Sequence, residues 1–314
     1  MGFALIVLTF NAEREIPSLF SAIAQQTLQP DCILVIDSSS RDGTQGLLST
    51  LPVTVHVIPQ CEFDHSRTRQ LGTERVEADN YLFMTQDAIP AHPECFERLI
   101  QALLSDDKIG CAYGRQLPHL NANPLAAHAR LFNYPEHSRI TTYADKDKWG
   151  VKTFFNSNSF SAYKKSALQR VGGFPAKLMV GEDCVVAAKM LREGYAVSYV
   201  AEACVYHSHN FTITQEFHRY FSIGVFHRDE HNIIKEFGTA NGEGGRFVLS
   251  ELCYLVKHHK IQWIPRALLS SVVKLLSYKA GLYHHAIPLC IKKRWGVNRS
   301  FWLKVASQLK SISS

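Results

Sequence analysis

The chain has 314 residues, 46% of them hydrophobic and 20% charged, which is typical of a globular protein with one large domain or one domain and an appendage. Its eight cysteines are scattered without a C-x-x-C pair, so the sequence favours neither a zinc site nor a disulfide framework. The net charge of +6 is uneven, because residues 252–314 hold 11 Lys or Arg and no acid, whereas residues 1–251 carry a net charge of −5. We therefore expect an acidic-to-neutral body with a strongly basic C-terminal appendage.

Neither a signal peptide nor a membrane-spanning helix is expected. The apolar run at residues 3–10 is short, and it lacks the basic region and the cleavage site of a signal peptide. No run reaches the roughly 18 apolar residues that a spanning helix needs. We expect most of the thiols to be buried, in a reducing compartment.

Apolar runs alternate with helical patterns in the first 90 residues. The runs predict strands at residues 3–8, 32–36, 53–58 and 81–85. Between them we expect an amphipathic helix at 16–23 capped by Asn11, a short helix starting at Asp42, and a helix carrying Arg67 and Arg69. This alternation predicts βαβ units and a parallel sheet. The absence of G-x-G-x-x-G and of G-x-x-x-x-G-K-[ST] disfavours dinucleotide-binding proteins and P-loop NTPases.

Two of the predicted strands end in an acid, Asp37 after the second and Asp87 after the fourth. Ligands of open α/β sheets bind beyond the carboxyl ends of the strands, where such acids would hold a metal or a charged substrate. A single acid in this position is more often a cap of the next turn. Two of them favour a ligand site.

The pattern is more mixed between residues 93 and 210. We expect helices at 93–104 and 165–171, strands at 109–113 and 195–200, and an irregular loop over 116–150. Residues 154–162 alternate aromatic and small polar side chains, which fits a strand or a pocket lining. Glu182 and Asp183 open a further helix, where they either cap it or form a paired-acid site. His207 and His209 follow a strand and are a modest signal for a metal or phosphate site.

The C-terminal third is predicted to be helical, with a Gly-rich loop at 238–245. Apolar and basic residues interleave after Phe247, and Trp295 and Trp302 lie among them. Basic amphipathic helices with Trp favour an interfacial membrane anchor. A helical cap packed on the body and a basic surface for nucleic acid remain alternatives, although the lack of any acid makes a plain cap the less favoured one.

Taken together, six segments resemble the family 2 inverting glycosyltransferases of the GT-A fold, and among them the bacterial rhamnosyltransferases of surface polysaccharide synthesis. The matching segments are 8–11 (LTFN), 37–44 (DSSSRDGT), 63–69 (FDHSRTR), 85–88 (TQDA), 181–183 (GED) and 206–209 (YHSH). The resemblance implies a GT-A type, Rossmann-like, mostly parallel sheet flanked by helices over residues 1–212. Residues 213–314 would form the helical, basic, membrane-associating region.

The resemblance also implies roles for single residues. It places Thr9, Asn11 and Asp37 at the nucleoside, Ser39, Arg67 and Arg69 at the ribose or diphosphate, and Gln86 among the substrate-binding residues. Separately, we expect the loop at 116–150 and residues 156–161 to shape the acceptor site, with Asn158 as the candidate contact. Asp87 stands at the D-x-D position, where it would bind Mg²⁺ or Mn²⁺. Thr85 replaces the first acid of that motif, and His207 or His209 would complete the site. Asp183 would be the general base, ahead of Glu182.

These residue types suit the chemistry of glycosyl transfer. The departing nucleoside diphosphate carries the charge of two phosphates, which a divalent cation and arginines stabilise. Mg²⁺ is commonly held by one or two carboxylates together with phosphates, so a single Asp87 is compatible with a metal site. The attacking hydroxyl must lose a proton, and a carboxylate within about 3 Å serves as the base.

The expected partners follow from the resemblance. They are a nucleotide-sugar donor, with dTDP-rhamnose preferred over a UDP- or GDP-sugar, a polyprenyl-diphosphate-linked saccharide acceptor, and an anionic membrane surface, with no nucleic acid. The expected location is the cytoplasmic face of the bacterial inner membrane, as a peripheral protein. A sugar nucleotidyltransferase is the alternative enzyme, although residues 8–14 lack the glycines of its activating loop. A non-catalytic module with a nucleic-acid-binding tail is the third hypothesis. The sequence leaves the oligomeric state open.

Overall fold

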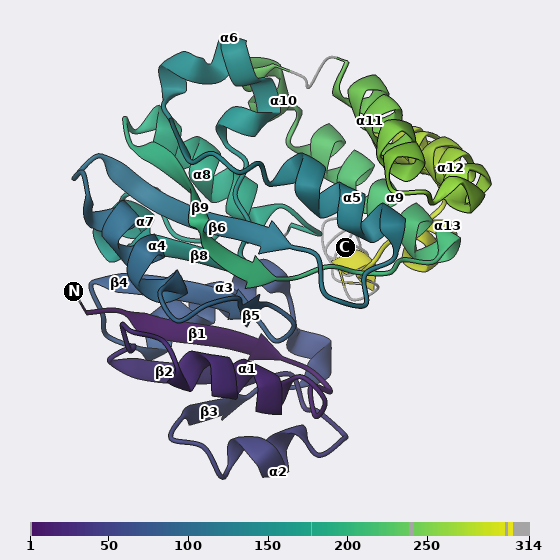
Figure 1. Ribbon diagram of the computed structural model, residues 1–314. Helices are drawn as coiled ribbons and strands as arrows, with labels where there is room; N and C mark the ends of the chain where they lie inside the picture. The colour runs from purple at the N-terminus through teal and green to yellow at the C-terminus, as the bar shows by residue number, and fades with distance from the viewer. Residues whose placement is uncertain (1, 177, 239–241, 299–300, 304–314) are drawn as a thin grey trace, which may run out of the picture.

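A twisted sheet of nine strands runs through the molecule (Figure 1), and the computed structural model describes residues 2–176, 178–238, 242–298 and 301–303. The strands are β1 (Ala4–Thr9), β2 (Cys32–Asp37), β3 (Thr54–Val57), β4 (Asn80–Thr85), β5 (Ile89–Pro90), β6 (Ile109–Leu117), β7 (Arg139–Thr141), β8 (Phe160–Lys164) and β9 (Ala196–Tyr206). Their order is β3-β2-β1-β4-β8-β6-β9-β5, with β7 on β9. The first four strands pair in parallel, β8 is antiparallel to both of its neighbours, and β6 and β9 are parallel.

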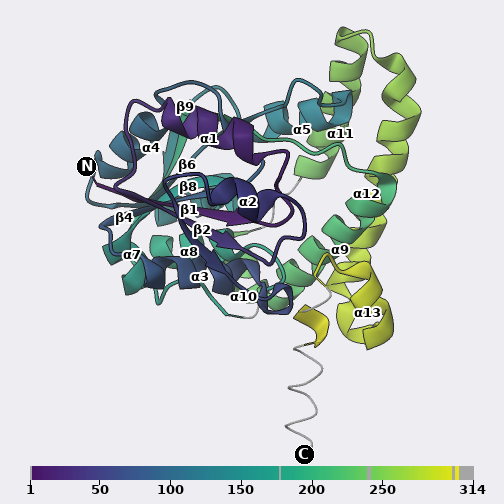
Figure 2. The ribbon, with the colours of Figure 1, turned by 90° about the horizontal axis from the view of Figure 1, so that it is seen from below.

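Helices cover both faces of this sheet. They are α1 (Ile16–Ala24), α2 (Thr44–Leu48), α3 (His65–Arg75), α4 (Cys95–Leu104), α5 (Pro124–Asn133), α6 (Lys146–Trp149), α7 (Lys165–Arg170), α8 (Glu182–Arg192), α9 (Ile213–Asp229), α10 (His231–Phe237), α11 (Glu243–Lys257), α12 (Ile264–Leu282) and α13 (Leu289–Trp295). The turned view separates the layers, with α1 and α4 on one face and α3, α7 and α8 on the other (Figure 2). The predicted α/β fold is confirmed.

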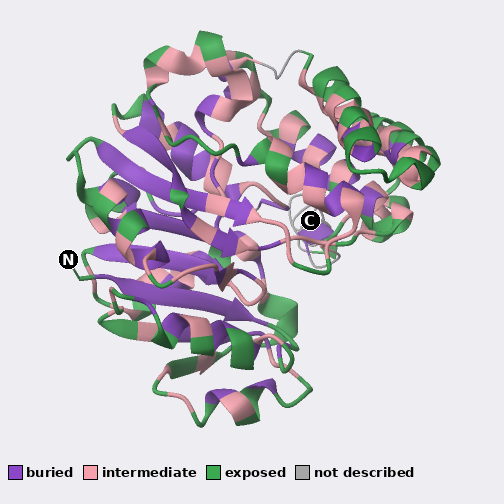
Figure 3. Cartoon of the chain, viewed as in Figure 1, coloured by how far each residue is buried: buried purple, intermediate pink, exposed green. Residues whose placement is uncertain are grey.

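The alternation of side chains along each strand explains the two layers. Ile6 and Leu8 of β1 belong to the core under α8 and α10, whereas Leu5 and Val7 belong to the core under α1 and α4. Successive strand residues point to opposite faces, so a strand buried on both faces needs a continuous apolar run. The central strands are therefore the most deeply buried part of the molecule (Figure 3).

Two predictions about local structure are wrong. Asn11 does not cap α1, because Glu15 occupies the cap position and Asn11 adopts a left-handed backbone with φ of 49°. Residues 116–150 are not simply an irregular loop, since they contain α5 and β7. The side chain of Asn123 caps α5 and Pro124 takes its first position, which is a helix-start signal that the sequence carries. The three residues of β7 are ordered by pairing with β9.

Helix α12 packs directly on α9 at two glycines. A Cβ on Gly281 would lie 2.1 Å from the main-chain oxygen of Phe221, and one on Gly224 would lie 2.2 Å from that of Tyr278. The two backbones therefore touch, which only glycine allows at these positions. Part of the basic appendage is thus a packed layer on α9, next to α11 (Figure 2).

A buried acid of α9 draws two basic residues of α12 into this packing. Glu216 is 5% exposed, and its carboxylate lies 3.2 Å from Arg266 Nη1 and 3.5 Å from Lys274 Nζ. Ser270 also donates a hydrogen bond to it. Among the described residues, none of the helices is long and apolar enough to cross a bilayer. The basic residues Arg299, Lys304 and Lys310 lie outside the described residues.

Candidate functional site

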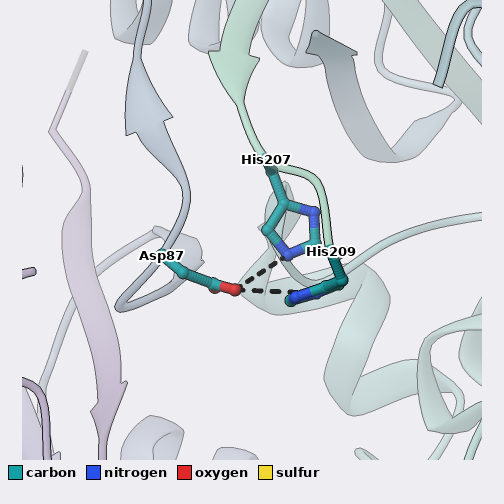
Figure 4. Close-up of side chains that lie close together, drawn as sticks. All are labelled: Asp87, His207 and His209. Carbon is teal, nitrogen blue, oxygen red and sulfur yellow. Dashed lines mark ion pairs between the residues drawn. The ribbon is translucent and has the colours of Figure 1, made fainter. Parts of the chain in front are cut away.

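Asp87, His207 and His209 converge at the carboxyl ends of β4 and β9 (Figure 4). Asp87 Oδ2 lies 3.4 Å from His207 Nε2 and 3.6 Å from His209 Nε2. The two imidazole rings are nearly perpendicular, with centroids 4.8 Å apart. Thr85, which replaces the first acid of the motif, donates its hydroxyl to Asp87 Oδ1 at 2.7 Å.

Sheet pairing brings these residues together from positions 120 residues apart. The short strand β5 follows Asp87 and pairs antiparallel with the end of β9, placing Ile89 opposite Tyr206. His207 is the next residue along the chain, and its main-chain N–H donates to Leu117 at the end of β6. Three strand ends therefore fix the cluster at the edge of the sheet where α/β proteins bind ligands.

The surroundings of the cluster shift the pKa values of all three groups. Burial lowers the pKa of His207, and it lowers the pKa of His209 to about 4. Burial acts to raise the pKa of Asp87, but the hydrogen bond and charge that His207 offers when it is protonated, together with the hydroxyl of Thr85, outweigh burial and hold that pKa below its usual range. At neutral pH the cluster therefore presents one carboxylate and two uncharged imidazoles.

This donor set fits a divalent cation. One carboxylate oxygen and two imidazole nitrogens lie within 4.8 Å of one another. Carboxylate together with imidazole suits Mn²⁺ and other transition metals, whereas Mg²⁺ prefers oxygen ligands alone. A pocket of about 360 Å³ opens beside His209 and is lined also by His119, Phe211 and Gln215.

A second group of acids lies at the start of α8. Asp183 Oδ2 accepts a hydrogen bond from the backbone N–H of Asn158 at 3.1 Å, and its Oδ1 accepts one from Cys184. Glu182 is 5% exposed and forms an ion pair with Arg69, with Nη1 and Oε1 2.6 Å apart. The two neighbouring acids thus differ, because Glu182 has a buried cationic partner and Asp183 has only backbone donors.

The pKa values separate the two acids further. Burial raises the pKa of Asp183 to about 6, and the charge of Glu182 adds to this effect. Burial also acts to raise the pKa of Glu182, but Arg69 and His65 outweigh it and hold that pKa below its usual value. Asp183 is therefore the carboxylate whose proton affinity suits a general base near neutral pH.

The turn at residues 156–159 connects the two groups. Ser159 accepts a hydrogen bond from the backbone N–H of Thr85, and Ser157 accepts one from Gln116, which contacts His207. Asn158 is 1% exposed and donates its side-chain amide to Glu182. Its Oδ1 accepts hydrogen bonds from Ser161 and Tyr163. The side chain of Asn158 therefore supports the acids and is not on the surface of a cleft.

The predicted nucleoside end is formed by the loops after β1 and β2. Asp37 is fully buried and accepts four hydrogen bonds, from the hydroxyl of Thr9, the hydroxyl and N–H of Ser40, and the amide of Gln45. Asn11 accepts from the N–H of Arg41, and the Ser39 hydroxyl donates to Ile58. The structure thus brings Thr9 and Asp37 into direct contact, with Asn11 and Ser39 on the adjoining loops.

The remaining predicted site residues differ in exposure. Arg67 is exposed on α3, whereas Arg69 is 4% exposed and paired with Glu182. Gln86 holds the loop after β1, since its side-chain amide bonds both the N–H and the carbonyl of Phe10. Of the two arginines, Arg67 is the one that a ligand could reach in this conformation.

Sequence reasoning missed three residues at the site. His119 Nε2 donates to the main-chain oxygen of Asp87 at 3.2 Å, and Gln116 bonds His207. Arg219 of α9 is exposed, and its charge contributes to lowering the pKa values of His65, His207 and His209. Gln116 and Arg219 carry no motif, and only the fold brings them near His207.

Sequence comparisons place this geometry among known proteins. The family model described as Glycosyl transferase family 2 matches residues 4–172. The chain is 45% identical to the O-antigen chain rhamnosyltransferase RfbN of Salmonella typhimurium and 43% identical to the O-antigen chain rhamnosyltransferase WbaN of Salmonella anatum. Each match covers 96% of both chains.

The fold is also similar to a solved structure, the mannosyltransferase PcManGT from Pyrobaculum calidifontis in complex with GDP-Man and Mn²⁺. The TM-score is 0.57 at 17% identity, and the match covers 98% of this chain and 86% of that one. At this identity the likeness shows the fold alone.

Proposed function

The chain belongs to glycosyl transferase family 2 and is a glycosyltransferase, and we propose that it transfers L-rhamnose from dTDP-rhamnose to a lipid-linked saccharide during bacterial O-antigen synthesis. The observation that carries this proposal is the identity of 45% and 43% to two O-antigen chain rhamnosyltransferases over 96% of the chain. Each match covers 96% of both chains, so it is not confined to the N-terminal part that the family model matches. A donor of the UDP- or GDP-sugar class is the alternative.

Asp183 is the proposed general base. Its carboxylate is held by two backbone N–H donors at the start of α8, which fixes its direction without neutralising its charge. The acceptor hydroxyl gives up its proton to Asp183 as its oxygen attacks the anomeric carbon of the donor from the face opposite the leaving group. The configuration at that carbon is inverted. Glu182, held as a carboxylate by its ion pair with Arg69, positions the turn through Asn158 and takes no proton.

Asp87, His207 and His209 are the proposed metal ligands, with Mn²⁺ preferred over Mg²⁺ because two of the three donors are imidazoles. When bound, the cation would neutralise charge on the diphosphate leaving group. Arg219 and Arg67 are exposed cations, and Arg219 is close enough to influence both histidines. We assign these two arginines to the diphosphate, and we assign Arg69 to Glu182.

The loops after β1 and β2 are the proposed nucleoside site. The carboxylate of Asp37 accepts hydrogen bonds from the hydroxyls of Thr9 and Ser40 and so fixes the shape of the loop. The pyrimidine of the donor would lie against the edge of this loop. Asn11, Ser39 and Gln86 hold adjacent backbone in place. Asn11, Ser39 and Gln86 would therefore act on the nucleoside site indirectly, by fixing the backbone that surrounds it. Asn158 orders the acceptor side in the same way.

Helices α11 and α12 are the proposed contact with the cytoplasmic face of the inner membrane, within the basic region 213–314. Five residues of α12 form an exposed apolar stripe on one side of the helix, each 46–61% exposed: Leu268, Leu269, Val272, Leu275 and Leu276. Exposed lysines lie on the same pair of helices and the turn between them: Lys257, Lys260 and Lys279. An apolar stripe flanked by cations fits an anionic lipid surface, where a polyprenyl-linked acceptor would be found.

The experiment that tests the function is donor turnover. Purified protein would be incubated with dTDP-rhamnose, UDP-glucose, UDP-galactose or GDP-mannose and a membrane extract that supplies the acceptor, with and without Mn²⁺. We expect nucleoside diphosphate release from dTDP-rhamnose, stimulated by Mn²⁺ and lost in Asp87→Ala. Release from another donor would overturn the rhamnose assignment and keep the family, and pyrophosphate-dependent formation of a nucleotide sugar would support a nucleotidyltransferase.

A further inference from the structure

Three side chains behind the metal-ligand cluster form a hydrogen-bonded chain. Gln116, at the end of β6, is 2% exposed, and its Oε1 lies 2.8 Å from His207 Nδ1. The same oxygen accepts a hydrogen bond from Arg130 Nη1 of α5 at 2.5 Å. The amide nitrogen of Gln116 donates to the hydroxyl of Ser157 at 2.8 Å. None of these three contacts involves Asp87.

The direction of this chain is set by Arg130. A guanidinium has only donors, so the group of Gln116 that faces it must be the carbonyl oxygen. Turning the amide over would place its NH₂ against another donor. Because that oxygen only accepts, the atom of His207 that contacts it must carry a hydrogen, and this atom is Nδ1. The hydrogen bond of one nitrogen thereby determines the state of the other.

We propose that Gln116, oriented by Arg130, is a positioning residue that keeps His207 in its Nδ1–H form and turns the lone pair of Nε2 toward Asp87. The proposal rests on the proposed function only in one respect, namely that a metal ion binds between His207 Nε2 and Asp87. The contact between His207 Nε2 and Asp87 Oδ2, at 3.4 Å, then joins two acceptors. Two acceptors facing each other favour a cation between them, so Gln116 prepares the cluster for metal.

The other bonds at the cluster agree with this assignment. Asp87 Oδ1 is occupied by the hydroxyl of Thr85, which leaves Oδ2 as the oxygen directed at both imidazoles. His119 donates to the main-chain oxygen of Asp87 and so holds the turn without using the carboxylate. Partners of a ligating histidine typically change metal affinity about 10- to 100-fold when they are removed. Gln116 should have an effect of that size.

The test compares two substitutions of Gln116 with a matched control. Gln116→Met removes the acceptor, whereas Gln116→Glu keeps an oxygen for both Arg130 and His207. Gln26→Met is the control, because Gln26 is also buried with three hydrogen bonds, none of them to the cluster. The full chain is used throughout, and thermal unfolding is recorded for each variant.

Two properties are measured, each starting from metal-free protein. The first is the tautomer of His207, from two-bond ¹H–¹⁵N correlations of ¹⁵N-histidine-labelled protein at pH 8, assigned by the signals that His207→Gln removes. The second is Mn²⁺ affinity, from the electron paramagnetic resonance signal of free Mn²⁺. We expect the Nδ1–H form in the wild type and in Gln116→Glu, an Mn²⁺ affinity about 10- to 100-fold weaker in Gln116→Met, and an unchanged affinity in Gln26→Met.

Each contrary result has a defined meaning. An Nε2–H form in the wild type would overturn the proposal even if no variant folded, and so would equal Mn²⁺ affinity in Gln116→Met and wild type. An affinity in Gln116→Glu as weak as in Gln116→Met would also overturn it. The donor assay is separate: a wild type that shows the Nδ1–H form and binds Mn²⁺ but releases no nucleotide from dTDP-rhamnose would contradict the proposed donor alone.

Discussion

The guanidinium of Arg69 and the carboxylate of Glu182 form a buried ion pair, 2.6 Å from Nη1 to Oε1, between α3 and the start of α8. Both side chains are almost fully enclosed, and Asn158 donates to the same Oε1 at 3.2 Å. Asp183 follows in the chain and feels the charge of Glu182. Glu182 therefore affects two quantities, namely the stability of the fold through its ion pair with Arg69 and the pKa of Asp183 through its charge.

We predict two effects of Glu182→Gln. Removing one partner of a buried pair leaves the other charge uncompensated, which costs about 3 kcal/mol of unfolding free energy. Because Glu182 raises the pKa of Asp183, the substitution should also move the acid limb of the activity profile to lower pH. Urea unfolding measures the first effect, and donor turnover against pH measures the second.

A surface pair supplies the control for this prediction. Glu77 forms an ion pair with Lys165, but its side chain is 90% exposed. Glu77→Gln should therefore cost less than about 1 kcal/mol and leave the pH profile in place. Equal losses in the two variants would contradict the assignment of a special role to the buried pair. An unshifted profile in Glu182→Gln would show that its charge does not reach the base.

The second prediction concerns Asp183 itself. A base with a pKa of about 6 is ionised above that pH, so kcat/KM should rise about tenfold per pH unit below 6 and level off above it. Asp183→Asn should lower kcat by about 10²- to 10⁴-fold without loss of Mn²⁺ binding, because no ligand of the cluster is changed. Steady-state turnover between pH 4.5 and 8 would check both statements. A profile without a limb near pH 6 would point to another base.

The sequence predicted the parts of this protein that depend on local pattern. Apolar runs located the central strands because a strand buried on both faces needs them, and the helix predicted at 165–171 is α7, which is followed by Gly172 and Gly173 at positive φ. The resemblance placed Asp87 and His207 in one family pattern, and the fold brings them within 3.4 Å. The strand and helix signals each lie within a few residues of the chain, whereas Asp87 and His207, which are 120 residues apart, were brought together only by the resemblance.

Features that depend on distant pairing could not be predicted in this way. Whether Arg69 faces solvent or Glu182 is decided by how α3 packs against α8, and residue spacing does not encode that packing. Gln116 reaches His207 because β6 and β9 pair in parallel with Leu117 beside Tyr206. Asn158 was expected in the acceptor site, and its burial follows from the turn into β8. Each of these contacts is tertiary.

The third prediction concerns the glycine contact between α9 and α12. Gly281→Ala would place a methyl group 2.1 Å from a backbone oxygen, so the helices must separate, at a cost of about 2 kcal/mol or more. Gly244→Ala in α11 is the control, because nothing lies within 4 Å of its added carbon. Thermal unfolding should show a clear fall in Tm for the first variant and none for the second. A similar Tm in both would mean that α12 is not held on α9 as described.

The fourth prediction concerns the apolar stripe of α12. Leu269, Val272 and Leu276 are 52–61% exposed and lie on one side of the helix. Changing all three to Glu should weaken binding to vesicles of anionic phosphatidylglycerol and phosphatidylethanolamine more than tenfold, because it removes apolar contact and adds charge that the lipid repels. Sedimentation of the protein with vesicles measures this loss, and binding should also fall with salt.

The control for the stripe carries the same change of charge elsewhere. Val57, Leu104 and Leu120 are exposed apolar residues of the body, 48%, 37% and 101% exposed, and none lies on α11 or α12. Changing these three to Glu adds the same net charge, so a general electrostatic effect would weaken vesicle binding in both triple variants. A loss confined to the α12 variant would support a specific lipid-facing stripe. Unchanged vesicle binding in that variant would contradict it, and salt-sensitive binding to DNA instead would favour a nucleic-acid role for the basic region.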